Sequence, residues 1–180
     1  MNLPNKLTVL RVLMIPLFLF FVLAEFVPLN ILWALAVFGI ASATDWFDGM
    51  LARKYGLVTN FGKFLDPLAD KILVMSAIIC FAWERWVDPV AVILILSREF
   101  MVSGLRMVVA NEGVVVPAGL MGKLKTAFTM VALVAIMGLQ IIGFDRFLIN
   151  EILIWICTAL TIVSGISYLK AYWAYIDSSK

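Results

Sequence analysis

Four aspartates lie within 26 residues of the chain and form two pairs. Asp45 and Asp48 are three residues apart, and Asp66 and Asp70 are four residues apart. In α-helices, both spacings put the two carboxylates of a pair on one face. Two helices joined by a loop of about a dozen residues are typically antiparallel neighbours. We therefore expect the two pairs to come together at one end of a helix pair.

Clustered carboxylates repel one another and need a cation. The sequence contains no histidine, and its two cysteines, Cys80 and Cys157, lie inside apolar runs. Oxygen ligands without histidine or cysteine favour Mg²⁺ or Mn²⁺ over zinc. Four carboxylates can hold two such ions when one of them bridges, an arrangement used in phosphoryl transfer. The aspartates therefore predict a site for two divalent cations.

A second explanation of the same residues is ordinary salt bridging at helix ends. Four cations lie close to the aspartates in sequence: Arg53, Lys54, Lys63 and Lys71. However, the small residues Gly49, Ala52 and Gly62 are interleaved with the acids. Short side chains let a bulky nucleotide approach a helix closely, and Arg53 offers a planar fork to phosphate oxygens. These features favour a ligand site over salt bridges alone.

A second polar group interrupts a later apolar stretch. Glu99, Ser103 and Arg106 follow a helical i, i+4, i+7 spacing, and Lys123 and Lys125 come after a short break. Charges inside a membrane helix are expected to face the protein interior or a polar cavity. Arg106, Lys123 and Lys125 therefore predict a cationic pocket for an anionic ligand, near the metal site but distinct from it. The alternative is that the lysines are membrane-surface anchors and that the neighbouring Arg98 pairs with a carboxylate of another helix.

The elements that position these groups must be membrane helices. The chain of 180 residues is 64% hydrophobic and 14% charged, with a mean hydropathy of +1.05, unlike a soluble domain. We expect an all-α, polytopic membrane protein with a single domain over residues 1–180. Six apolar stretches have the length of a span: 8–27, 29–48, 67–87, 89–110, 117–142 and 147–172.

The distribution of basic residues predicts the orientation of these spans. With the N-terminus inside, the cytoplasmic segments hold Lys6, Arg53, Lys54, Lys63, Lys123, Lys125, Lys170 and Lys180, and the opposite turns hold only Arg85 and Arg146. By the positive-inside rule, both termini are cytoplasmic in the cell membrane. The net charge of +2 is too small to indicate a nucleic-acid partner.

The aspartate-rich stretch resembles the signature of a known family. From Asp48 to Asp70 the chain reads D-G-x2-A-R-x8-G-x3-D-x3-D, and Asp45 precedes it. This pattern is similar to that of the CDP-alcohol phosphotransferases. The resemblance implies a dimeric membrane enzyme of six helices, in which an alcohol displaces CMP from a CDP-linked donor. Bound lipid surrounds such a protein, and the donor implied here is CDP-diacylglycerol.

The resemblance also implies roles for individual residues. Asp45, Asp48 and Asp66 would be ligands of two divalent ions, Mg²⁺ or Mn²⁺. Asp70 would lie near the second ion and act as the base that deprotonates the acceptor hydroxyl. The CDP part of the donor would be lined by Asp45, Asp48, Gly49, Ala52, Arg53 and Gly62.

Three further stretches, REFMVSGLR, VVVPAGLMGKLKT and NLPNKLTVLRVLMIP, resemble the subfamily that uses sn-glycerol 3-phosphate as acceptor. The acceptor phosphate would then bind Arg106, Lys123 and Lys125, with additional contacts from Asn5, Thr8, Arg11 and Arg98. For the first three of these additional residues, an interfacial helix cap and anchor gives the same pattern. Rival functions are transfer to a second phospholipid, inositol phosphate or an amino alcohol, divalent-cation transport, and a structural scaffold.

Overall fold

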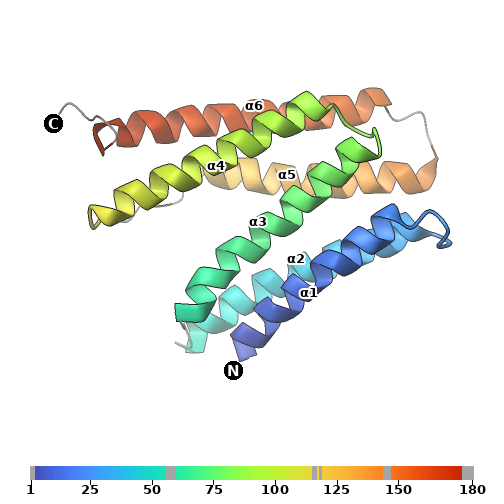
Figure 1. Cartoon of the computed structure of the whole chain (residues 1–180), viewed down its shortest axis with the longest axis horizontal. Coiled ribbons are helices and arrows are strands. Elements are labelled where there is room, and N and C mark those ends of the chain that lie inside the picture. The colour runs from blue at the N-terminus through green and yellow to red at the C-terminus, as the bar shows by residue number, and fades with distance from the viewer. Residues whose placement is uncertain (1–2, 56–59, 115–116, 118, 144–146, 176–180) are drawn as a thin grey trace. The chain divides into compact units, whose positions relative to one another are not determined.

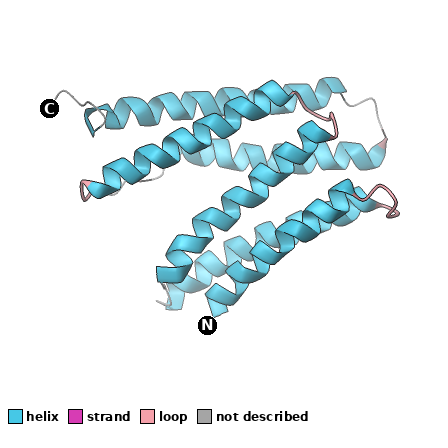
Figure 2. Ribbon diagram, in the orientation of Figure 1, coloured by secondary structure: helices cyan, strands magenta, loops and turns pink. Residues whose placement is uncertain are grey.

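The computed structural model describes residues 3–55, 60–114, 117, 119–143 and 147–175. Within these ranges, the side chains of residues 3–7, 45–55, 60–67 and 70 lie outside the description. The described part of the chain contains six α-helices, one short 3-10 helix and no strand (Figures 1 and 2). The prediction of an all-α protein is confirmed. The helices are α1 (Leu3–Leu23), α2 (Asn30–Tyr55), α3 (Asn60–Trp83), α4 (Pro89–Asn111), α5 (Leu120–Ile142) and α6 (Phe147–Tyr172), followed by η1 (Trp173–Tyr175).

The ends of α4 follow from local capping chemistry. Asp88 is the N-cap, and its carboxylate accepts a hydrogen bond of 2.8 Å from the backbone N–H of Val90. Pro89 occupies the first helical position, where its missing N–H costs nothing. At the other end, Gly113 adopts a positive φ of 75°, a conformation that stops helices at low cost for glycine.

The second and third helices extend further toward each other along the chain than the predicted spans do. Helix α2 continues to Tyr55 and α3 already begins at Asn60. The reason is that hydropathy marks where a span leaves lipid and does not mark where a helix ends. Residues 49–55 include leucine, alanine, arginine and lysine, which are good helix formers outside lipid as well.

The chain divides into two compact units. The first comprises Met1–Trp83 and Met137–Phe144, and in it α1 packs against α2 and α3. The buried positions of α1 recur every three or four residues, as expected for one helical face: Thr8, Arg11, Met14, Ile15, Phe18 and Val22. Phe18 meets Phe38 of α2 with ring centroids 5.8 Å apart. This stripe holds the first unit together.

The second unit comprises Glu84–Ile136 and Asp145–Lys180, and α4 packs along α6 within it. Both helices bury residues at alternating steps of four and three, which is the spacing of a coiled-coil seam. On α4 these residues include Ala91, Ile95, Arg98, Val102, Leu105 and Val109. On α6 they include Asn150, Ile154, Cys157, Thr161, Ser164 and Tyr168. Most residues of the α6 stripe are small or polar, as is common where membrane helices approach closely.

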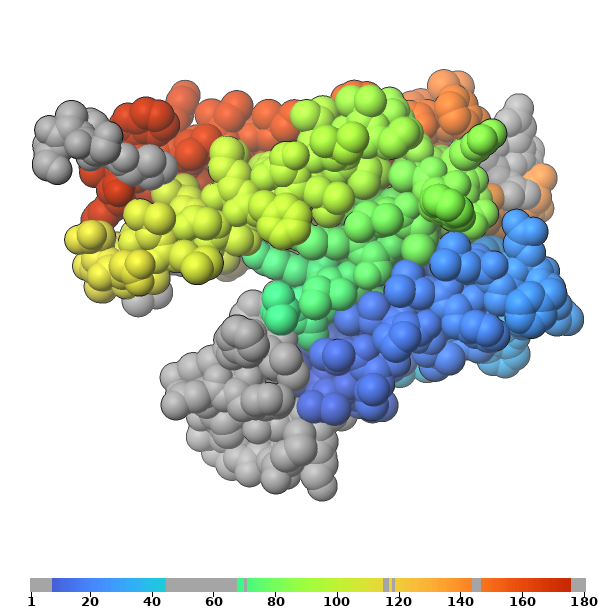
Figure 3. Space-filling view, viewed as in Figure 1, coloured from blue at the N-terminus to red at the C-terminus, as the bar shows by residue number. Residues whose placement is uncertain are grey.

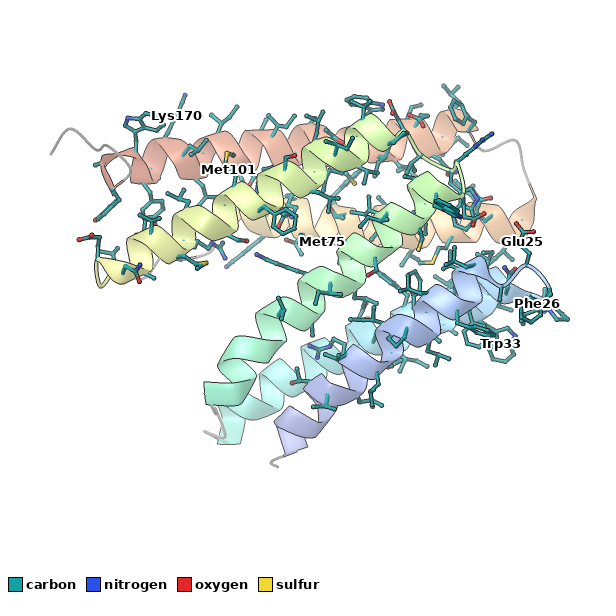
Figure 4. The ribbon with its side chains drawn as sticks, viewed as in Figure 1. Glu25, Phe26, Trp33, Met75, Met101 and Lys170 are labelled. Atoms are coloured by element: carbon teal, nitrogen blue, oxygen red, sulfur yellow. The ribbon has the colours of Figure 1, made fainter. Side chains whose placement is uncertain are left out.

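Large apolar side chains cover much of the outside of both units. Phe100 and Met107 of α4, a helix whose outer surface is visible in Figure 3, are 67% and 71% exposed. Figure 4 shows Phe26 beside Glu25 in the turn between α1 and α2, and Trp33 on the first turns of α2; all three side chains are exposed. Surfaces of this kind are unusual for a protein in water.

Two segments of the described chain are long and apolar enough to cross a membrane, Leu120–Ile142 and Phe147–Tyr175. Shorter apolar helical segments cover Thr8–Leu23, Asn30–Thr44 and Lys71–Trp83. The boundaries of α4 and α6 agree with the predicted spans 89–110 and 147–172 to within one residue. Helix α1 instead ends at Leu23, four residues before the predicted end at residue 27, because the turn that follows is itself apolar.

Candidate active site

The residues of the aspartate motif lie on two consecutive helices of the first unit. The backbone is helical at both aspartate pairs, so each pair lies on one face of its helix. Helix α2 carries Asp45, Asp48, Gly49, Ala52 and Arg53, and α3 carries Gly62, Asp66 and Asp70. Helices α2 and α3 contact each other and both contact α1. The side chains of these motif residues, and that of Asn5, lie outside the described residues.

The donor set of the motif suits hard divalent cations. It consists of four carboxylates and includes neither histidine nor cysteine, and oxygen donors of this type match Mg²⁺ or Mn²⁺. Among the side chains that the structure describes, no group of three or more histidine, cysteine, aspartate or glutamate residues could hold a metal ion. The four motif aspartates carry the oxygen donors that such ions prefer.

Thr8 and Arg11 lie one turn apart on the buried stripe of α1 in the same unit. Thr8 is fully buried and Arg11 is 1% exposed, and both take part in polar interactions. An interfacial anchor keeps its charged head in water, so the buried position of Arg11 does not fit that alternative. A buried guanidinium needs polar or anionic partners.

In the second unit, a carboxylate joins two cations that come from different helices. Lys125 Nζ of α5 lies 2.5 Å from Glu99 Oε1 of α4, and Arg98 Nη1 lies 2.7 Å from the same oxygen. The side chains of Arg98, Glu99 and Lys125 are 8%, 13% and 12% exposed. Ion pairs with so little access to water are screened weakly and depend on each partner.

Helix α6 supplies the neutral partners of the two arginines. Arg98 Nη2 donates to Ser164 Oγ at 2.7 Å, and Arg106 Nη2 donates to the hydroxyl of Tyr168 at 2.9 Å. The guanidinium carbons of Arg98 and Arg106 lie 5.9 and 5.1 Å from the centroid of the Tyr168 ring, within the range of cation–π attraction. We call Arg98, Glu99, Arg106, Lys125, Ser164 and Tyr168 the basic cluster.

A glycine of α6 makes room for one of these arginines. A Cβ at Gly165 would lie 2.9 Å from Arg98 Cγ and 3.3 Å from Arg98 Nε. Real Cβ atoms do not approach other atoms to 2.9 Å, so any larger residue at Gly165 displaces the arginine or its helix. The small residue therefore determines where the Arg98 side chain can lie.

The basic cluster has both the charge and the free donors to bind an anion. Its three cations and one carboxylate leave a net charge of +2, which matches a phosphate monoester dianion. Within the described part of the chain, the Nε atoms of Arg98 and Arg106 are buried and have no hydrogen-bond partner. Buried polar groups are normally paired, and arginine binds phosphate through adjacent N–H groups.

The structure brings together some of the residues proposed for this pocket and separates one of them. Arg98, Arg106 and Lys125 are linked through Glu99 and Tyr168, whereas Lys123 is exposed on α5. Arg98 pairs with a carboxylate of its own helix and with a hydroxyl of α6, so the alternative of a carboxylate partner on another helix is wrong for the described residues.

The sequence analysis did not identify Ser164, Gly165 or Tyr168. They lie far from the arginines along the chain: Ser164 is 66 residues from its partner Arg98, and Tyr168 is 62 residues from its partner Arg106. The available signal was the regular stripe of small and polar residues in an otherwise apolar α6. Such stripes mark helix contacts in membranes, although they do not name the partner.

Comparison with known proteins identifies the class of this chain. A family model described as CDP-alcohol phosphatidyltransferase matches residues 1–163, and the chain belongs to this family. Proteins of this family generally depend on divalent cations.

Individual relatives are similar over nearly their whole length. The chain is 42% identical over 191 aligned residues to the CDP-diacylglycerol–glycerol-3-phosphate 3-phosphatidyltransferase of Bacillus subtilis (strain 168), with 99% of this chain and 98% of the relative covered. A protein of the same name from Rickettsia bellii is 46% identical, with 94% of each chain covered. A third, from Pseudomonas fluorescens, is 39% identical, with 99% and 93% covered.

Proposed function

We propose that this protein transfers a phosphatidyl group from CDP-diacylglycerol to sn-glycerol 3-phosphate, giving phosphatidylglycerophosphate and CMP. Relatives of that name support the reaction, since they match the chain over nearly its full length. The basic cluster is the observation that supports this acceptor, because a buried group of net charge +2 suits an alcohol that bears a phosphate. A neutral alcohol would leave this net charge of +2 uncompensated.

The aspartate motif would hold two divalent cations, Mg²⁺ or Mn²⁺, through Asp45, Asp48, Asp66 and Asp70. When bound, the cations neutralise the diphosphate of the donor and stabilise the departing CMP. Asp70 has a second role as the base that accepts the proton of the acceptor hydroxyl.

The remaining motif residues would bind the CDP group. Gly49, Ala52 and Gly62 leave space beside the helices for the nucleotide, and Arg53 donates to phosphate oxygens. The primary hydroxyl oxygen of the acceptor attacks the lipid-side phosphorus. A new P–O bond forms while the bond to CMP breaks, and CMP leaves with its electron pair. The transfer is a single displacement, and the acyl chains stay in lipid.

We assign the acceptor phosphate to Arg106 and Lys125, with Arg98 as a third cation of the same cluster. Arg106 keeps donors that the Tyr168 hydroxyl does not use, including its buried Nε. Lys123, being exposed, would attract the anion before it binds. Asn5, Thr8 and Arg11 are proposed as further acceptor contacts.

We further propose a single membrane domain of residues 1–180, with six spans, both termini in the cytoplasm and an active site that faces the cytoplasm of the cell. The distribution of lysine and arginine supports this orientation. A homodimer surrounded by lipid is proposed from the family, and the exposed apolar side chains are compatible with it.

The function is tested by measuring CMP release from CDP-diacylglycerol by the purified protein. We expect sn-glycerol 3-phosphate to support release, EDTA to abolish it, and added Mg²⁺ or Mn²⁺ to restore it. Release with inositol phosphate, an amino alcohol or a second phospholipid, but not with glycerol 3-phosphate, would overturn the proposed acceptor. Metal flux into proteoliposomes without CMP release would instead indicate a transporter.

The role of Asp70 is tested by Asp70→Asn. We expect this variant to lose most turnover and to keep some donor binding, because the amide retains the size of the side chain and cannot take a proton. Wild-type turnover would remove Asp70 as the base.

A further inference from the structure

The hydroxyl of Tyr168 is the point where three segments of the second unit meet. It accepts hydrogen bonds from Arg106 Nη2 of α4 and from the backbone N–H of Gly119, both at 2.9 Å. It donates to the carbonyl oxygen of Pro117 at 3.1 Å. A phenol has one donor and two acceptor sites, so every hydrogen-bonding site of this hydroxyl is used.

These bonds link an arginine of the basic cluster to the chain that leads into α5. Pro117 and Gly119 directly precede α5, which begins at Leu120 and carries Lys125. One side chain of α6 therefore holds the Arg106 head group and the start of the helix that supplies Lys125. The first turn of α5 also lies close to Tyr168, since a Cβ at Gly122 would lie 3.5 Å from the same hydroxyl.

The ring of Tyr168 is fixed independently of its hydroxyl. The residue is 6% exposed and packs with Val102, Leu105 and Val109 of α4. A phenylalanine at this position keeps the apolar contacts and the ring beneath both guanidinium groups. The role of the hydroxyl can therefore be separated from the role of the ring.

We propose that Tyr168 is a positioning residue for the acceptor phosphate, acting through Arg106 and through Pro117 and Gly119. The inference rests on the proposed function. An arginine head group that is already oriented loses little conformational entropy when it binds its anion. Without the hydroxyl, Arg106 is free to rotate and the start of α5 loses two hydrogen bonds, so acceptor binding weakens while donor binding does not.

The test is Tyr168→Phe, with Tyr172→Phe as the matched control. Tyr172 lies one turn further along α6 and stacks on Tyr168 with ring centroids 6.4 Å apart, and its hydroxyl is not part of the basic cluster. We expect Tyr168→Phe to raise the KM for sn-glycerol 3-phosphate about 10-fold, the effect of losing one hydrogen bond to a charged group. The KM for CDP-diacylglycerol should stay within about twofold and kcat within about threefold, as should all constants of the control.

Inorganic phosphate gives a second readout that does not require the reaction. We expect it to compete with sn-glycerol 3-phosphate, and we expect its inhibition constant to rise in Tyr168→Phe by the same factor as the KM. Neither KM nor an inhibition constant depends on the fraction of protein that is active, so a partly unfolded preparation still gives the answer. Equal values for wild type and variant would overturn the proposal.

A double-mutant cycle with Arg106→Gln shows whether Tyr168 acts through the arginine. We expect Tyr168→Phe to change the KM for the acceptor by less than about twofold in the Arg106→Gln background. A further 10-fold increase there would mean independent effects and would overturn the proposal. If wild type does not use sn-glycerol 3-phosphate at all, the proposed function fails. If Arg106→Gln raises the KM but Tyr168→Phe does not, the function stands and only this inference fails.

Discussion

The aspartate motif of the first unit and the basic cluster of the second differ in how the chain assembles them. The motif occupies 26 residues of two consecutive helices, and its pairs are set by helical spacing alone. The contacts of the basic cluster join residues 26, 62 and 66 positions apart. The motif is thus local and can be recognised from the sequence, whereas the cluster forms only when α4, α5 and α6 pack together.

The two regions also differ in how their charges are balanced. The four motif aspartates share one sign, and the divalent cations proposed to balance them come from outside the chain. The basic cluster carries its own counter-ion, Glu99, and an aromatic ring within 6 Å of two guanidinium groups. We therefore expect substitutions in the motif to act on activity through the metal, and substitutions in the cluster to act on acceptor binding and stability.

The largest effect is expected from the motif. Asp66→Asn should lower kcat on the order of 10³-fold, because the proposed metal site would lose one ligand where charge develops in the transition state. The protein should remain folded, with wild-type thermal unfolding in detergent. Glu25→Gln, an exposed acid in the turn between α1 and α2, is the control and should keep full activity. Normal turnover of Asp66→Asn would place the metal site elsewhere.

The next effect separates two lysines that sequence alone does not distinguish. Lys125 is 12% exposed and bound to Glu99, whereas Lys123 is exposed. Lys125→Met should raise the KM for sn-glycerol 3-phosphate about 10-fold, as expected for a buried charged partner. Lys123→Met should change it less than about twofold, because exposed charges are screened. The reverse order would contradict the assignment of the acceptor phosphate to the basic cluster.

The third prediction concerns stability, which should fall when the counter-ion Glu99 is removed. Glu99→Gln leaves Arg98 and Lys125 close together with little access to water. We expect the free energy of unfolding to fall by about 3 kcal/mol, the typical cost of breaking a buried ion pair. Chemical denaturation in detergent measures the change. The exposed Glu112 provides the control Glu112→Gln, and equal stability of the two variants would show that Glu99 is not needed as a counter-ion.

The smallest effect contrasts two glycines of the second unit. Gly165→Ala brings a Cβ to 2.9 Å from Arg98 Cγ, whereas a Cβ at Gly104 meets no atom within 4 Å. Gly165→Ala should lower the melting temperature by a few degrees, about 1 to 2 kcal/mol of overpacking. Gly104→Ala should be neutral or raise it, because alanine favours the helix. A stabilising Gly165→Ala would mean that Arg98 has room to move aside.

Much of the helical architecture could be predicted from the sequence, but some helix ends were predicted more accurately than others. Helix α4 begins as expected because Asp88 and Pro89 form a capping signal that is local. The end of α1 at Leu23 was missed because the following turn, which includes Phe26 and Leu29, is apolar too. Leu29 adopts a positive φ of 56°, a conformation that hydropathy does not report.

Residues of the candidate site also differ in whether the sequence could indicate them. The cations Arg106 and Lys125 could be chosen from the sequence because charges in apolar helices stand out. Tyr168 could not, because the chain has other tyrosines near the end of α6, including Tyr172 and Tyr175, which look equally suited to a membrane interface. Only the packing of α6 against α4 makes one of them buried and bonded to Arg106.

The sequence by itself determined most of the helices, the family and the spacing of the motif aspartates, because these depend on hydropathy, on capping and on residues that lie close together along the chain. Tertiary structure alone decided which cations share a counter-ion and which tyrosine holds an arginine. Contacts across 60 residues or more depend on the register of two packed helices. That register is set by complementary large and small side chains along the α4–α6 seam.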